Sequence, residues 1–202
     1  MLLEVLQLIR QMTQVFEALE VSYYIGGSVA SGQYGLPRLT RDVDFIADLR
    51  EKHVPAFVAA LEDGFYVDAN AVVRAVRACT SFNLIHFETV YKIDIFVPAT
   101  DAWSQAKMQR RLSKRLAEGL DAPAAFVASA EDTVLQKLRW FQKGGGVSER
   151  QWDDVLGVLK VQAKALDYAY MQRWATDLGV AELLRQAMVD AGLEPDRTTE
   201  RQ

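Results

Sequence analysis

The sequence predicts an α/β fold in which a mixed sheet is flanked by helices, followed by an all-helical C-terminal part. Two observations support this. Apolar runs rich in β-branched and aromatic residues alternate with stretches of helical periodicity up to about residue 128. Beyond that point only helical periodicity continues. We therefore expect a core over 1–128, a helical subdomain over 129–193 and a polar tail over 194–202.

Each element follows from a local pattern. Apolar residues recur three and four apart in the expected helices, and Gly35, Pro37 and Gly64 are typical helix stops. The expected helices cover 2–19, 28–34, 51–62, 70–78, 101–118, 130–142, 148–162, 167–178 and 180–191. The expected strands cover 21–25, 41–47, 82–86, 91–97 and 125–128.

Composition excludes several classes of protein. The 202 residues contain a single cysteine, Cys79, and two histidines, which exclude an internal disulfide and a His-rich metal site. We find no apolar stretch of the ~18–20 residues that span a bilayer and no signal-peptide pattern, so we expect a cytoplasmic protein without a membrane partner. The net charge of −4 argues against nucleic-acid binding by bulk charge, but it allows a local basic patch.

Three aspartates on two expected strands are candidate metal ligands. Asp42 and Asp44 are two residues apart, so their side chains point to one face of a strand, and Asp94 lies on a neighbouring strand. Three adjacent carboxylates repel one another unless a cation holds them. Mg²⁺ (or Mn²⁺) prefers such oxygen ligands together with phosphate oxygens. Two such ions could clamp the attacking and leaving oxygens of an in-line displacement.

A glycine turn precedes these acids. Gly26 and Gly27 follow an apolar run and allow the backbone to approach a phosphate closely. Ser28 adds a hydroxyl and an N–H group at the expected start of a helix. The turn and the acids together indicate a site for a nucleoside triphosphate, with Gly27 and Ser28 holding its β and γ phosphates.

These motifs resemble the nucleotidyltransferase superfamily, and most closely its branch of abortive-infection AbiEii-type toxins. The resemblance spans about residues 20–190. It is carried by Ile25-Gly26-Gly27-Ser28, Tyr34-Gly35-Leu36-Pro37-Arg38-Leu39-Thr40-Arg41-Asp42-Val43-Asp44-Phe45, Lys92-Ile93-Asp94, Ala130-Glu131-Asp132-Thr133-Val134-Leu135-Gln136-Lys137-Leu138 and Arg150-Gln151-Trp152-Asp153-Asp154-Val155-Leu156. Trp152-Asp153 departs from the pattern, because many relatives carry a basic residue near the aspartate.

The resemblance implies a nucleotidyltransferase-type sheet and a Mg²⁺-dependent transfer of a nucleoside monophosphate from NTP to a hydroxyl. It further implies an RNA acceptor, such as a tRNA 3′ end, and a toxin whose partner is an antitoxin protein. Asp94 would act as a metal ligand or as a base. Two alternatives stay open: the same core acting on a small molecule or a protein side chain, and a non-catalytic module that binds a nucleotide or a partner.

Three further positions have both a functional and a structural interpretation, and a fourth has a functional one. The resemblance gives Lys137 the role of stabilising the triphosphate, but this lysine could simply extend to solvent. Asp154, preferred over Asp153 because Val155 follows it, would act chemically or would orient Lys137; its expected partner is Lys137 or Arg139. Arg38 would contact a phosphate or pair with Asp42 or a surface acid. Thr40 is a candidate nucleotide ligand.

A cluster of cations falls within the expected helix 101–118. Its members are spaced i, i+3, i+4, i+7 and i+8, which places them on one helix face. This face would bind an RNA acceptor or the triphosphate, or would be an ordinary solvated surface. The residues are Lys107, Arg110, Arg111, Lys114 and Arg115.

Overall fold

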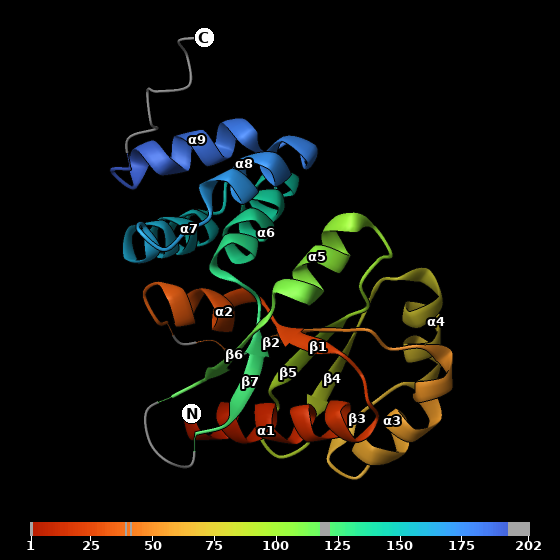
Figure 1. Ribbon diagram of the computed structural model, residues 1–202. Helices are drawn as coiled ribbons and strands as arrows, with labels where there is room; N and C mark the ends of the chain where they lie inside the picture. The colour runs from red at the N-terminus through yellow and green to blue at the C-terminus, as the bar shows by residue number, and fades with distance from the viewer. Residues whose placement is uncertain (1, 39, 41, 118–121, 194–202) are drawn as a thin grey trace. The chain divides into compact units, whose positions relative to one another are not determined.

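The computed structural model describes residues 2–38, 40, 42–117 and 122–193 (Figure 1). The chain divides into two compact units, which are described separately below. The first contains Met1–Val29 and Leu39–Ala128, and the second contains Ala30–Arg38 and Ser129–Gln202. The expected polar tail, and Leu39 and Arg41 of the first motif, lie outside the described residues.

The first unit contains a mixed seven-stranded sheet with the strand order β3-β4-β5-β2-β1-β7-β6. Strand β2 is parallel to β5 and β1 is parallel to β7, whereas the remaining neighbours are antiparallel. The mixed sheet expected from the sequence is confirmed. Its strands are β1 Tyr23–Ile25, β2 Asp42–Ala47, β3 Phe65–Tyr66, β4 Ser81–His86, β5 Lys92–Phe96, β6 Leu112–Arg115 and β7 Ala124–Val127.

The two faces of this sheet differ in character. Every second residue of β2 and β5 is buried, as in Val43, Phe45 and Ile93. Phe16 of helix α1, Leu2–Ala18, packs against this apolar face, with its ring 5.4 Å from that of Phe45. The alternate residues, which include the acids of β2 and β5, are only partly buried or exposed and point to the opposite face. We call this opposite side the acidic face.

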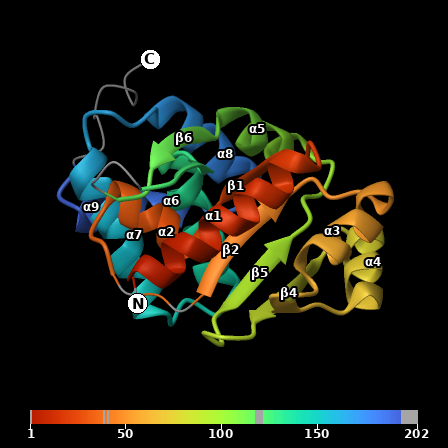
Figure 2. The same ribbon diagram turned by 90° about the horizontal axis from the view of Figure 1, so that it is seen from below.

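Helices complete the first unit (Figure 2). Asp68 caps α4 by accepting a hydrogen bond from the Asn70 N–H at 2.9 Å, and Asp101 caps α5 in the same way through Ser104. Helix α2, Gly27–Tyr34, begins in the first unit and ends in the second. The other helices are α1 Leu2–Ala18, the 3₁₀ turn η1 Glu51–His53, α3 Val54–Leu61, α4 Ala69–Ala78 and α5 Ala102–Arg110.

From Ala130 onward the described residues form only helices, as the sequence predicted. Within the second unit the chain after α2 lies against α7, and a Cβ atom added at Gly35 would be 2.8 Å from the Gly157 carbonyl carbon. Gln162 also donates a hydrogen bond to the Tyr34 carbonyl at 2.9 Å. The helices are α6 Ala130–Lys143, α7 Glu149–Gln162, α8 Tyr168–Asp177 and α9 Ala181–Asp190.

The expected helix over 101–118 is wrong beyond Arg110. Arg111 has extended backbone angles, with φ −57° and ψ 142°, and β6 then pairs antiparallel with β7 from Leu112 opposite Val127 to Arg115 opposite Ala124. The spacing of the cations reports only the local preference of this segment for a helix. The strand forms instead because it pairs with β7, about a dozen residues later in the chain. The short strand β3 was also missed, because two residues carry no periodicity.

None of the described helices combines the length and apolar character needed to cross a lipid bilayer.

Candidate active site

Two of the predicted aspartates lie side by side on the acidic face. Strands β2 and β5 pair in parallel with Asp44 opposite Asp94, and with Asp42 opposite Lys92. Neighbouring strands lie about 4.8 Å apart, so the Asp44 and Asp94 side chains leave the sheet next to each other. Asp42 lies two residues before Asp44 on the same face and is exposed. The pairing of the two strands that the sequence predicted is therefore confirmed.

Lys92 is a member of this site that the sequence reasoning missed. Its Nζ atom lies 2.9 Å from Oδ2 of Asp94, whose side chain is 20% exposed. The hydrogen bond that Lys92 donates to Asp94, together with the charges of Asp94, Asp42 and Asp44, raises the pKa of Lys92. Lys92 is thus a counter-charge for the carboxylates. Lys92 lies two residues before Asp94 on the same strand, so the two side chains point to one face. The same spacing rule placed Asp42 beside Asp44 and could have identified Lys92.

The glycine turn is packed directly against Asp44. The Gly26 N–H donates a hydrogen bond to the Asp44 carbonyl at 2.9 Å. Gly27, the first residue of α2, has φ +56°, and a Cβ atom there would lie 1.7 Å from Oδ2 of Asp44. Only glycine fits both this backbone conformation and this distance. The first turn of α2, including the partly buried Ser28, therefore begins at the Asp44 carboxylate.

Thr40 fixes the start of β2. Its hydroxyl donates to the Asp42 carbonyl at 3.0 Å and accepts from the Asp42 N–H at 3.3 Å. This local turn sets where Asp42 enters the strand. The role of Thr40 as a nucleotide ligand stays a prediction.

The acidic face has the chemistry of a divalent-cation site, but it is not arranged as one in this conformation. Within the described part of the chain, no three His, Cys, Asp or Glu side chains are grouped closely enough to hold a metal ion. The donor set fits Mg²⁺, since Asp42, Asp44 and Asp94 supply hard carboxylate oxygens from one face. The Lys92–Asp94 ion pair is the contact that a bound cation would have to replace.

The second unit contains an ion cluster formed by Arg38, Lys137 and Asp154. Lys137 donates to Oδ2 of Asp154 at 2.7 Å, and Arg38 donates to both carboxylate oxygens at 3.2 and 3.3 Å. The Lys137 and Asp154 side chains are 9% and 7% exposed. Burial by itself raises the pKa of Asp154, but the hydrogen bonds and charges of Arg38 and Lys137 outweigh it and hold that pKa below its usual value.

These contacts resolve three alternatives that the sequence left open. The partner of Asp154 on the preceding helix is Lys137. Arg38 also pairs with Asp154, an acid with a buried side chain that the sequence did not suggest as its partner. Lys137 does not extend to solvent, because its side chain is almost fully buried. Asp153 is exposed, whereas Asp154 makes the cluster, so Asp154 is the structurally important acid. Whether the cluster contributes to chemistry stays a prediction.

The expected basic helix face does not exist. Lys107 is 8% exposed, and its ammonium lies 3.6 Å from the centre of the Trp103 ring. Arg111 follows α5 and stacks on Phe126, with 4.7 Å between the guanidinium carbon and the ring centre. The remaining residues are split between the end of α5 (Arg110) and β6 (Lys114 and Arg115). Strand geometry directs the last two to opposite sides.

The structure thus brings together two sets of predicted residues. Asp42, Asp44 and Asp94 share the acidic face with the glycine turn in the first unit. Arg38, Lys137 and Asp154 form the ion cluster in the second unit.

Comparison with known proteins supports the fold. No protein-family model matches the chain, and no curated protein gives a significant sequence match. Among solved structures, the antibiotic-resistance factor ANT(2″)-Ia in solution has a TM-score of 0.56 at 11% identity, with 95% of this chain and 98% of that chain covered. Its crystal structure in complex with adenylyl-2″-tobramycin has a TM-score of 0.54 at 11% identity, with 91% and 99% covered.

An antigenic nucleotidyltransferase-like protein from Paracoccidioides brasiliensis has a TM-score of 0.54 at 17% identity, with 89% of this chain and 88% of that chain covered. At such identities the likeness establishes the fold, which is that of nucleotidyltransferase-like proteins. The expected fold class is confirmed. Membership of the AbiEii-type branch stays a prediction.

Proposed function

We propose that this protein is a Mg²⁺-dependent nucleotidyltransferase that moves a nucleoside monophosphate from NTP to a hydroxyl group and releases pyrophosphate. The observation that carries the proposal is the register of β2 and β5, which pairs Asp44 with Asp94 while the Gly27 turn lies against Asp44. The carboxylates suit a metal ion. The helix start beside them suits phosphates. The fold shared with nucleotidyltransferase-like proteins supports the same reaction class.

Each residue of the acidic face has a role in this proposal. Asp42, Asp44 and Asp94 would hold Mg²⁺ or Mn²⁺, which when bound neutralises the triphosphate and lowers the pKa of a coordinated hydroxyl. Asp94 accepts the proton of the acceptor hydroxyl or holds that hydroxyl in place. The hydroxyl oxygen forms a bond to the α-phosphorus as the bond to the pyrophosphate oxygen breaks. Lys92 leaves Asp94 when the substrates bind.

Two groups of residues would bind the triphosphate itself. Gly27 and Ser28 at the start of α2 would bind the β and γ phosphates, since helix N-termini favour anions, and Gly26 would let the backbone approach them closely. Lys137 would stabilise the charge that develops on the leaving pyrophosphate. The contacts of Asp154 with Lys137 and Arg38 would hold that ammonium in position.

Two classes of acceptor hydroxyl are candidates, one on RNA and one on a small molecule. An RNA acceptor, such as a tRNA 3′ end, and a toxin role opposed by an antitoxin rest on the sequence resemblance alone, because the basic helix face that favoured RNA is absent. A small-molecule acceptor is the second candidate. It is favoured by the fold likeness to ANT(2″)-Ia, whose crystal structure contains adenylyl-2″-tobramycin.

Radiolabel transfer distinguishes these acceptors. The purified protein would be incubated with Mg²⁺ and each [α-³²P]NTP in turn, either with total cellular RNA or with a panel of aminoglycosides. Asp44→Asn serves as the inactive variant and Asp153→Asn, at an exposed position, as the matched control. Label on RNA or on an aminoglycoside with wild type and Asp153→Asn, but not with Asp44→Asn, would identify the acceptor class. No label in either mixture, with NTP bound but never turned over, would favour a non-catalytic module.

A further inference from the structure

Strand β4 has an edge that β3 only partly covers. Strand β3 pairs with Ile85 and His86 alone, whereas β4 begins four residues earlier at Ser81. On that side of residues 81–84, no strand in the described part of the chain forms a ladder. The stretch Ser81-Phe82-Asn83-Leu84 is therefore an exposed sheet edge, a natural template for another strand.

The hydrogen-bonding groups of this edge can be assigned from the β4–β5 ladder. The Val97 N–H donates to the Thr80 carbonyl at 2.8 Å, and the His86 N–H donates to the Tyr91 carbonyl at 3.0 Å. Even-numbered residues of β4 thus bond toward β5. In an antiparallel pair, the backbone groups of successive residues point alternately toward the partner strand and away from it. The N–H and C=O groups of Ser81 and Asn83 therefore point away from β5, toward the open edge.

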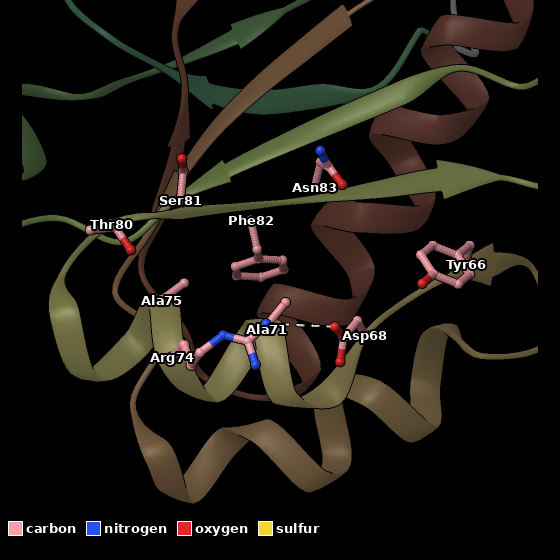
Figure 3. A pocket seen from close by; sticks show the side chains of 9 residues that line it. All are labelled: Tyr66, Asp68, Ala71, Arg74, Ala75, Thr80, Ser81, Phe82 and Asn83. Carbon is pink, nitrogen blue, oxygen red and sulfur yellow. Dashed lines mark ion pairs between the residues drawn. The ribbon is translucent and has the colours of Figure 1, made fainter.

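A cavity of about 390 Å³ lies at this edge (Figure 3). The small side chains of Ala71 and Ala75 on α4 leave room beside the strand, and Phe82 points from β4 toward α4. The lining residues are Tyr66, Asp68, Ala71, Arg74, Ala75, Thr80, Ser81, Phe82 and Asn83. The cavity is thus a trough between a helix and the unpaired length of a strand.

A positive charge at the trough has only a weak partner. The Arg74 side chain is 70% exposed, and its guanidinium is 3.7 Å from a carboxylate oxygen of Asp68. An exposed ion pair of this length contributes little to stability, so Arg74 can exchange Asp68 for an incoming carboxylate. An acidic side chain is therefore the complement that this trough can accept.

The opposite edge of the sheet is protected, which makes the β4 edge distinctive. Strand β6 ends in Lys114 and Arg115, and charged side chains on an edge strand discourage strand addition. The open length of β4 contains neither a charged residue nor a proline.

We propose that the trough between β4 and α4 binds an extended, acidic peptide segment of a partner protein by strand addition. The segment pairs with the N–H and C=O groups of Ser81 and Asn83, and its acidic side chain contacts Arg74. Backbone pairing supplies affinity in this recognition mode, and the side-chain contact supplies specificity. The trough borders the acidic face, because Asn83 is the cross-strand neighbour of Asp94, but the peptide proposal does not depend on the proposed transferase reaction.

The test begins with a phage-displayed library of random octapeptides selected on the wild-type protein, and enriched peptides are resynthesised with fluorescein for polarisation titrations. Asn83→Pro removes the outward N–H while leaving the ladder to β5, since proline is tolerated where an edge N–H faces outward. Asn83→Ala is the matched control, because it removes only the side chain. We expect acidic peptides whose affinity falls at least fivefold with Asn83→Pro and Arg74→Glu but less than twofold with Asn83→Ala.

A second measurement uses wild-type protein only, so it stands even if Asn83→Pro unfolds. N-methylation of the peptide at successive positions should weaken binding at every second residue, as expected for a strand that donates alternate N–H groups. The proposal would be overturned if no peptide is enriched, or if N-methylation has no period of two. It would also be overturned if chromatography shows that Asn83→Pro converts a dimer to a monomer, because the occupant would then be a second copy of the chain.

Discussion

Replacing Gly27 with alanine tests the contact on which the site depends. Gly27 has φ +56°, and an added Cβ atom would lie 1.7 Å from Oδ2 and 2.7 Å from Cγ of Asp44. No pair of atoms tolerates that overlap, so either the Asp44 side chain or the start of α2 must move. Both are parts of the proposed phosphate and metal site.

The magnitude follows from two contributions. A left-handed backbone costs a residue with a Cβ atom about 1 to 2 kcal/mol. Displacing the Asp44 side chain from its preferred rotamer adds about 1 kcal/mol. Gly145→Ala is the matched control: Gly145 has φ +77° and nothing within 4 Å of its Cβ position, so it carries only the first contribution.

The assay compares both variants by urea unfolding and by the transfer of label from [α-³²P]NTP. We expect Gly27→Ala to lose about 1 kcal/mol more unfolding free energy than Gly145→Ala, and to lose most transferase activity while Gly145→Ala keeps it. Equal stability and equal activity of the two variants would refute the reasoning, because the Asp44 contact would then have no consequence.

Three further predictions concern single charged or phenolic groups. Asp154→Asn should cost about 3 kcal/mol, since it removes the carboxylate of a buried ion pair, whereas Asp153→Asn should cost little. The folded pKa of Asp154 is depressed, so urea titrations should show this difference shrinking as the pH falls below about 4, and a constant difference would contradict it. Burial, and after it the charge of Glu17, raises the pKa of Tyr23 to about 12. The phenolate absorbance of Tyr23, measured as the difference between wild type and Tyr23→Phe, should therefore not appear near pH 10. Lys92→Met should tighten Mn²⁺ binding several-fold in calorimetry; unchanged affinity would remove Lys92 as a competitor for the site.

The part of the site that depends on strand periodicity could be predicted from the sequence. The spacing of Asp42 and Asp44 directs both to one face whatever the rest of the fold does. The apolar residues between and after them identify the opposite, buried face. The same reasoning placed Asp94 on a neighbouring strand, and the observed register pairs it with Asp44.

Contacts between distant segments could not be read in this way. Arg38 and Asp154 are 116 residues apart, and no local pattern links them. The cations after residue 106 mimic a helix face, but pairing with β7 draws residues 112–115 into a strand. Sequence periodicity reports local preference, whereas an edge strand forms because a neighbouring strand offers hydrogen bonds.

The central claim is that Asp94, paired with Asp44, takes part in nucleotidyl transfer. The most direct measurement is the single-turnover rate of label transfer by wild type, Asp94→Asn and Asp153→Asn, each at saturating Mg²⁺ and NTP. The account predicts a loss of at least about 1,000-fold for Asp94→Asn, with unchanged thermal unfolding, and a wild-type rate for Asp153→Asn. A rate for folded Asp94→Asn within a few-fold of wild type would contradict it.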